Sequence, residues 1–190
     1  MGRTHQWIRV ERYWEGEFPN IRARFMPVMC QQCDAAPCEP VCPVNATYHT
    51  PEGLNAQVYN RCVGTRFCAN NCPYTARYFT WFTPEWPSPL NEQLNPDVSV
   101  RSSGIMEKCT FCVQRIRRAQ DTAKDEERGV RDGDTQPACA QACPAKVLVF
   151  GDLSDLDSEV SHLAHSRRGY RLLEELGTRP RVVYLKEADA

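Results

Sequence analysis

The chain has 190 residues, of which 42% are hydrophobic and 25% are charged, and its formal net charge at pH 7 is −1. This length fits one domain or two small ones that share a core, and the balanced charge disfavours a generic nucleic-acid binder, which needs a basic face. No apolar run approaches the roughly 20 residues that cross a bilayer, and no apolar signal-peptide segment follows Met1.

Eleven cysteines are the unusual feature of the composition. A disulfide framework in a short secreted chain normally has an even number of cysteines. A structural zinc site usually takes two CxxC pairs a dozen or more residues apart, and it has no need for a further cysteine followed by proline. Iron–sulfur ligation does use that arrangement, whereas covalent c-type haem would need CxxCH, which is absent. The cysteines therefore predict iron–sulfur clusters, with a zinc-binding interaction module as the alternative.

In chain order, residues 1–29 are predicted to form an N-terminal strand and a connector. Side chains alternate between apolar and polar over residues 7–14, which is typical of a short strand. Residues 16–20 are predicted to turn the chain, and residues 25–29 to lead it into the first cysteines.

Residues 30–82 form the predicted ferredoxin-like core, which contains two ladders, meaning two sets of closely spaced cysteines that each end in Cys-Pro. Between the ladders, Pro51 and Gly53 separate two short stretches within residues 46–59, which predicts a hairpin. Residues 77–82 are predicted to be a strand that packs over a cluster. The first ladder comprises Cys30, Cys33, Cys38 and Cys42; the second comprises Cys62, Cys68 and Cys72, with Thr65 where its middle cysteine belongs.

The rest of the chain divides into a Pro-rich irregular insertion (83–107), a second cysteine-containing part (108–150) and a C-terminal arm (151–190). Loops as long as the insertion are usually functional or partner-bound, although a solvated excursion is the alternative. After Cys112, apolar residues at helical spacing predict a helix that ends near Gly129, and residues 147–150 are predicted to be a buried strand. The third cysteine group comprises Cys109, Cys112, Cys139 and Cys143.

The C-terminal arm is predicted to be a helix over residues 154–176, interrupted near Gly169, followed by a strand at 181–185. Ser154 or Ser158 is its expected N-cap. The predicted fold class is therefore α+β: a duplicated ferredoxin-like domain with two ladders and hairpins, helical additions and the C-terminal arm.

Ligand sets follow from the spacing of the ladders. In a two-cluster ferredoxin, three neighbouring cysteines hold one cluster and the fourth reaches the other. The proline after that fourth cysteine restricts it to extended conformations. This rule assigns Cys30, Cys33, Cys38 and Cys72 to a [4Fe-4S] cluster, and Cys42, Cys62 and Cys68 to the second site.

The second site has three thiolates, because the hydroxyl of Thr65 is a poor ligand for iron at neutral pH. Its natural occupant is a [3Fe-4S] cluster, although water or a partner residue could instead complete a cubane. A three-iron cluster carries one electron, typically at a fairly high potential, and so suits the acceptance of electrons from a quinol.

The whole cysteine pattern resembles a known family. Two ladders followed by CxxC and CxxxCP are similar to the four-cluster iron–sulfur subunits of the dimethyl-sulfoxide-reductase and polysulfide-reductase type. Residues 60–74 (NRCVGTRFCANNCPY) look more narrowly like the iron–sulfur subunit of alternative complex III and of the related quinone reductase complex of sulfate reducers. Residues 7–16, 108–116, 137–144 and 178–184 fit the same group, so the resemblance covers nearly the whole chain.

The resemblance implies an iron–sulfur electron-transfer subunit of a membrane-associated oxidoreductase complex. It would lie peripherally on the outer, periplasmic face of the cytoplasmic membrane, against an integral quinone-binding subunit, with its three-iron cluster nearest the quinone. Its other partner would be a molybdopterin-type or multihaem cytochrome subunit, and the export signal would come from elsewhere in the polypeptide or from a partner.

Family members carry a further CxxCxxCxxxC run before the stretch that resembles residues 7–14, and this chain has none. In the family, that run gives a fourth ligand to the [4Fe-4S] cluster of Cys109, Cys112 and Cys139, and Cys143 completes the run's own cluster. A fragment is therefore expected. The alternatives are that another chain completes these sites, or that the four cysteines gather around one cluster.

No catalytic residue is predicted, because the chain contains no GxGxxG, GxSxG or HExxH motif. The four histidines, His5, His49, His162 and His165, have no ligand-like spacing. Four basic residues near the cysteines, Arg61, Arg66, Arg77 and Lys108, either offset the negative charge of the clusters or are ordinary surface charges.

Overall fold

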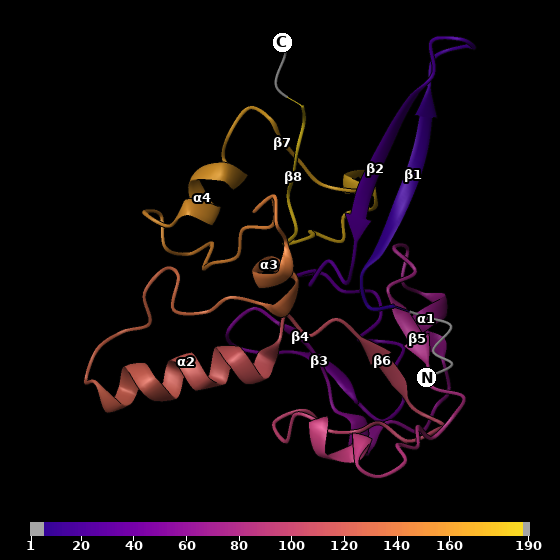
Figure 1. Cartoon of the computed structure of the whole chain (residues 1–190), viewed down its shortest axis with the longest axis vertical. Helices are drawn as coiled ribbons and strands as arrows, with labels where there is room; N and C mark the ends of the chain where they lie inside the picture. Colours follow the sequence, from indigo (N-terminus) through magenta and orange to yellow (C-terminus); the bar gives the residue numbers. More distant parts are fainter. Residues whose placement is uncertain (1–5, 188–190) are drawn as a thin grey trace. The chain divides into compact units, whose positions relative to one another are not determined.

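A computed structural model describes residues 6–187 (Figure 1). His5 and the first residues after Met1, on which the signal-peptide interpretation rests, lie outside the described residues. The chain forms two units. The first contains the residues up to Thr110 together with Glu175–Arg181, and the second contains Phe111–Glu174 and the residues from Val182 onwards.

The first unit begins with a long antiparallel hairpin. Strand β1 (Arg9–Glu15) pairs with β2 (Arg22–Val28), so that Arg9 lies opposite Val28. The predicted strand is therefore confirmed, whereas much of the predicted connector is in fact β2. Most of the hairpin is exposed, but burial begins at Val28 and continues through Cys30. The chain thus passes from the exposed hairpin directly into the buried first ladder (Figure 1).

Two short strand pairs follow the Cys-Pro turns of the two ladders. β3 (Thr47–His49) pairs with β4 (Asn55–Gln57), which confirms the predicted hairpin. β5 (Arg77–Phe79) pairs with β6 (Met106–Lys108) across the insertion. The predicted strand over 77–82 ends at Phe79, because Trp81 and Phe82 turn out to solvent. Two short helical segments, η1 (Tyr59–Arg61) and α1 (Phe67–Asn70), flank the start of the second ladder.

The insertion predicted over 83–107 is irregular, except for the 3₁₀ turn η2 (Leu90–Gln93) and its last two residues, which belong to β6. Its far end is anchored by the buried Arg101, whose Nε lies 3.3 Å from Glu107 Oε2. The Arg101 guanidinium also lies 4.8 Å from the centre of the Trp7 ring and 5.4 Å from that of Tyr59. Trp7 Nε1 donates to Glu107 at 3.1 Å. The buried ion pair between Arg101 and Glu107, packed against the rings of Trp7 and Tyr59, therefore anchors the end of the insertion in the core.

A segment from late in the sequence, Glu175–Arg181, belongs to the first unit and covers the first ladder. Thr178 is central to this contact, because its Oγ1 lies 2.6 Å from the buried Tyr74 hydroxyl. Arg181 Nε donates to Asp34 Oδ1 at 2.6 Å. Three backbone hydrogen bonds complete the contact: Asp34 N to Arg179 O, Ala35 N to Thr178 O, and Arg181 N to Gln31 O, at 2.9–3.1 Å.

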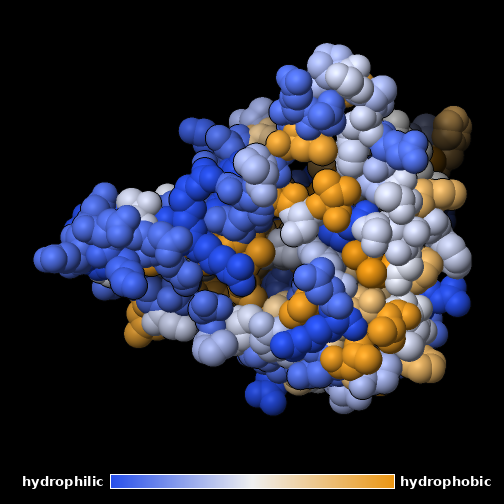
Figure 2. All heavy atoms as spheres, turned by 90° about the horizontal axis from the view of Figure 1, so that it is seen from below, coloured by the Kyte–Doolittle hydropathy of each residue, from blue (hydrophilic) through white to orange (hydrophobic). Residues whose placement is uncertain are grey.

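The second unit begins with helix α2 (Val113–Asp125), followed by the short α3 (Ala138–Ala142). The predicted apolar face of α2 is confirmed, because Ala119 and Ala123 are buried. The helix ends at Asp125, about one turn earlier than predicted. Figure 2 shows apolar side chains in separate groups on the face seen from below, among hydrophilic ones. No helix within residues 6–187 has both the length and the apolar character to cross a membrane.

Two predictions for the second unit are wrong. Residues 147–150 form no strand, because they follow the Cys-Pro turn at Cys143 and pair with none of the strands within residues 6–187. The helix predicted over 154–176 is only α4 (Glu159–Ala164), which begins after Ser158, whose Oγ accepts from Ser161 N at 3.2 Å. The remainder of that stretch forms β7 (Gly169–Tyr170), paired with β8 (Tyr184–Leu185), and the 3₁₀ turn η3 (Glu174–Leu176). The predicted strand at 181–185 is thus confirmed only at its end.

Candidate iron–sulfur sites

Four cysteines of the first unit surround a first hollow of about 300 Å³, which Tyr74 and Arg77 also line. This volume includes space that is open to solvent. The first ladder contributes three of the thiols and the second ladder contributes the fourth. They are Cys30, Cys33, Cys38 and Cys72.

The thiols of the first hollow are crowded and mostly buried. Burial, together with the neighbouring thiol of Cys30, raises the pKa of Cys33 to about 12. Burial also raises the pKa of Cys38, against the opposing effect of Arg77. Thiols in such a place ionise together only when cations bind among them, and metal ligation requires the thiolate form. The donor set therefore fits a polynuclear metal cluster.

A second hollow of about 280 Å³ is lined by three cysteines and by Thr65. Two of its sulfurs accept backbone hydrogen bonds, Cys42 from Ala46 N at 3.2 Å and Cys62 from Met106 N at 3.4 Å. For Cys42, burial acts against ionisation, but backbone N–H groups of residues 44, 46 and 47 lower its pKa overall. Such N–H donors stabilise cluster-bound sulfur and contribute to its potential. The three cysteines are Cys42, Cys62 and Cys68.

Thr65 occupies the position of a CxxC cysteine by its backbone as well as by its spacing. The residue before it, Gly64, has a φ of 73°. Gln32 and Phe111, which precede Cys33 and Cys112 in their own CxxC loops, have φ of 47° and 52°. In all three loops a residue with positive φ thus precedes the position that carries cysteine in two cases and threonine in the third. Thr65 is exposed, so it stands at the mouth of the second hollow.

The three Cys-Pro turns also share one local shape. The residue three positions after each cysteine donates its N–H to the cysteine carbonyl, at 3.3 Å for Asn45, 3.1 Å for Thr75 and 3.2 Å for Lys146. These three residues also have positive φ, of 48°, 49° and 52°. The turn directs the following N–H groups at the cysteine sulfur, which lowers the pKa of Cys143, chiefly through Val147.

Three cysteines of the third group lie in the second unit, where Cys112 Sγ accepts from Ala138 N at 3.4 Å. Burial raises the pKa of Cys139, and the thiols of Cys112 and Cys143 raise it further. The structure therefore brings Cys112, Cys139 and Cys143 within electrostatic range of one another. Cys109 belongs to the first unit, where its carbonyl accepts from Gln32 Nε2 at 3.0 Å and Lys108 Nζ at 2.9 Å.

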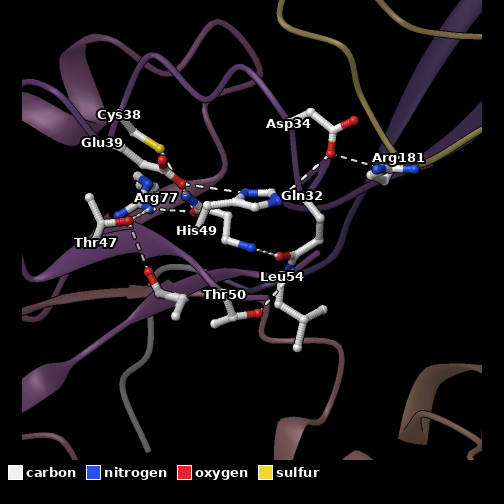
Figure 3. Close-up of polar contacts among 12 residues, drawn as sticks. Gln32, Asp34, Cys38, Glu39, Thr47, His49, Thr50, Leu54, Arg77 and Arg181 are labelled. Atoms are coloured by element: carbon white, nitrogen blue, oxygen red, sulfur yellow. Dashed lines mark hydrogen bonds and ion pairs between the residues drawn. The ribbon is translucent and has the colours of Figure 1, made fainter. Parts of the chain in front are cut away.

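All eleven cysteines are free thiols. Within residues 6–187, no three Cys, His, Asp or Glu side chains lie close enough together to hold a single metal ion. His49 lies between two carboxylates, 3.8 Å from Asp34 Oδ1 and 3.7 Å from Glu39 Oε1 (Figure 3). The thiols, in contrast, are distributed around open spaces.

The four basic residues near the ladders divide into two kinds. Arg61 and Arg66 are exposed, and the Arg66 guanidinium lies 5.3 Å from the ring centres of Phe79 and Trp81. Arg77 and Lys108 are buried, with exposed fractions of 5% and 0%. Sequence reasoning missed the polar residues that hold Arg77, and it missed Thr178, since no local pattern relates residue 178 to the first ladder.

Comparison with known proteins agrees with this chemistry. A family model described as a 4Fe-4S dicluster domain matches residues 21–87. The menaquinone reductase iron–sulfur cluster-binding subunit of Nitratidesulfovibrio vulgaris is 44% identical over 192 residues, which cover 98% of this chain and 75% of that protein. One of the subunits of the sulfite dehydrogenase of Allochromatium vinosum is 38% identical, over 93% of this chain and 62% of that protein. Iron–sulfur subunit 1 of the Hdr-like menaquinol oxidoreductase of Archaeoglobus fulgidus is 35% identical, over 95% of this chain and 64% of that protein.

The chain thus spans between about three fifths and three quarters of the length of these relatives. The alignments cover nearly all of its own residues, including both ladders and the third cysteine group. The chain belongs to the ferredoxin-like iron–sulfur subunits of the dimethyl-sulfoxide-reductase and polysulfide-reductase type.

Proposed function

We propose that this chain is the electron-transfer subunit of a membrane-associated, quinone-linked oxidoreductase complex. The observation that carries the proposal is the pair of hollows in the first unit, each lined by cysteines from both ladders. Bound clusters would supply one-electron carriers in these hollows. The protein's own residues hold the clusters by their thiolates, direct backbone N–H groups at the sulfurs and bury most of the first ligand set.

The first hollow takes a [4Fe-4S] cluster on Cys30, Cys33, Cys38 and Cys72. The second takes a [3Fe-4S] cluster on Cys42, Cys62 and Cys68, because Thr65 leaves one corner without a thiolate. The matching φ values before Cys33 and Thr65 and in the Cys-Pro turns support an origin by duplication of one ladder-and-turn unit. In the third group, Cys109, Cys112 and Cys139 hold a further [4Fe-4S] cluster, and Cys143 serves another, where a run of cysteines like that of the family is supplied.

The complex would join this chain to an integral quinone-binding subunit and to a molybdopterin-type or multihaem cytochrome subunit. Relatives whose names include menaquinone reductase and menaquinol oxidoreductase support the link to a quinone. We place the subunit peripherally on the outer face of the cytoplasmic membrane, as in the family it resembles.

The test is metal analysis with electron paramagnetic resonance (EPR) on anaerobically purified protein. Iron and acid-labile sulfide are expected, with about seven irons per chain from the two hollows, together with a three-iron signal in the oxidised protein. Addition of a quinol to the complex is expected to reduce that cluster, so that its EPR signal disappears. A colourless protein that contains zinc and no sulfide would establish the zinc-binding module instead.

A further inference from the structure

We propose that Arg77 is a fixed counter-charge shared by the two clusters, assisted by Lys108, and that it raises the reduction potential of both. This inference rests on the proposed function, because it needs a cluster in each hollow. Of the four basic residues near the ladders, Arg77 and Lys108 would thus set the cluster potentials, and Arg61 and Arg66 would contribute little to them.

Arg77 is buried, and three neutral side chains hold its guanidinium in place. Nη1 donates to Gln57 Oε1 at 2.8 Å, and Nη2 donates to Asn55 Oδ1 at 2.7 Å and to Thr47 Oγ1 at 2.5 Å. No carboxylate in the described part of the chain forms an ion pair with Arg77. Since a guanidinium does not lose its proton in proteins, a whole positive charge lies in the interior without an anionic protein partner.

This charge lies between the two ligand sets. Arg77 lines the first hollow, and Asn55, which accepts from Arg77, also accepts from Cys38 Sγ at 3.8 Å. On the other side, the guanidinium donates to Gln57 Oε1, and Gln57 lines the second hollow together with Cys42, Cys62 and Cys68. Figure 3 shows Arg77 beside Thr47 and close to Cys38. One cation therefore acts on thiols of both ladders.

Lys108 adds a second buried cation. In the register of β5 and β6 it lies directly opposite Arg77, and its Nζ donates to Cys109 O at 2.9 Å. Like charges that face each other across a strand pair are destabilising, and a buried charge is costly unless it is compensated. Clusters held by thiolates are anions, so they provide the compensation that the protein lacks.

A cluster gains a further negative charge when it is reduced. Nearby fixed cations stabilise that reduced form more than the oxidised form, and net charge is one of the factors that set cluster potentials. Burial strengthens the effect, because charges in the interior are little screened by water and salt. Arg61 and Arg66 are exposed, so screening by water and salt weakens their effect on the cluster potentials.

The experiment is an EPR-monitored redox titration of the anaerobically purified full chain, with iron and sulfide measured for each variant. In Arg77→Gln, which keeps an amide donor but loses the charge, both midpoint potentials should fall. At a fixed potential near the midpoint, the reduced-to-oxidised ratio of each cluster should drop at least tenfold, which is about 59 mV for one electron. Arg77→Lys should retain most of the unaltered potential, and the matched control Arg61→Gln should shift neither cluster by that amount.

Lys108→Gln provides an independent measurement if Arg77→Gln binds too little iron to titrate. It should lower the potential of the four-iron cluster, because the buried Lys108 lies opposite Arg77, which lines the first hollow. Unchanged potentials in whichever of these two variants retains its iron would overturn the inference, as would an equal fall in Arg61→Gln. Absence of iron from the unaltered protein would instead overturn the proposed function, so the two failures are distinct.

Discussion

Replacement of Thr65 by cysteine should convert the three-iron site to a four-iron site. Thr65 lines the second hollow with Cys42, Cys62 and Cys68, and the residue before it has a positive φ, as has the residue before Cys33. A thiol at this position would therefore supply the fourth thiolate that the set lacks.

The size of the effect follows from the count of ligands. Iron in the two hollows should rise from about seven to about eight atoms per chain, since a complete cubane holds four. Because Thr65 is exposed and cysteine is of similar size, the free energy of unfolding should change by no more than about 0.5 kcal/mol. The gain of iron would then reflect ligation and not a general change in stability.

The assay is iron analysis combined with EPR of the oxidised and the reduced protein. The signal of the oxidised three-iron cluster should disappear in Thr65→Cys, and the signal of a second reduced four-iron cluster should replace it. Thr65→Ser is the matched control, since it keeps a hydroxyl and should keep the three-iron signal. If Thr65→Cys retains that signal and gains no iron, the missing thiolate is not what defines the site.

Three further predictions test the crossing of the ladders, the loop before Thr65 and the cover of the first hollow. Cys42→Ser should remove the three-iron signal and spare the four-iron cluster, and Cys72→Ser should do the reverse; loss of the same cluster in both would show that the ladders do not cross. Gly64→Ala should lower the iron content of the second hollow, because a Cβ there would collide with Gly104 O at a positive φ of 73° that itself costs about 1–2 kcal/mol. Gly53→Ala, also at positive φ but with open space around its Cβ, should leave that iron content unchanged. Tyr74→Phe removes a buried hydrogen bond to Thr178 and should cost about 1 kcal/mol, seen as a fall in Tm of roughly 2–4 °C, whereas Tyr48→Phe should leave Tm within 1 °C of the unaltered protein as a rough limit.

Features that depend on local spacing were predictable from the sequence. The hairpin around Pro51 and Gly53 and the apolar face of α2 both come from residues a few positions apart, and the structure has both. The grouping of Cys72 with the first ladder followed from a rule about cluster ligands, and the structure brings these thiols to one hollow. The missing thiolate at Thr65 was predictable because this residue follows Cys62 at the CxxC spacing of the first ladder.

Features that depend on distant residues were not predictable in the same way. Val147 and its neighbours have the composition of a strand, but no strand among the described residues pairs with them, and propensity carries no information about the presence of a partner strand. The segment around Tyr170 has helical composition, yet it pairs with Tyr184, whose ring centre lies 5.7 Å away. The sequence placed Arg77 near the ladders, but only the structure distinguishes it from the exposed Arg61.

The cover that Glu175–Arg181 forms over the first ladder has a consequence for biogenesis. Asp34 and Arg181 are separated by 147 positions, so a ribosome completes the ladder long before it makes the segment that closes over it. The cover over the first ladder can therefore form only after most of the chain has been synthesised.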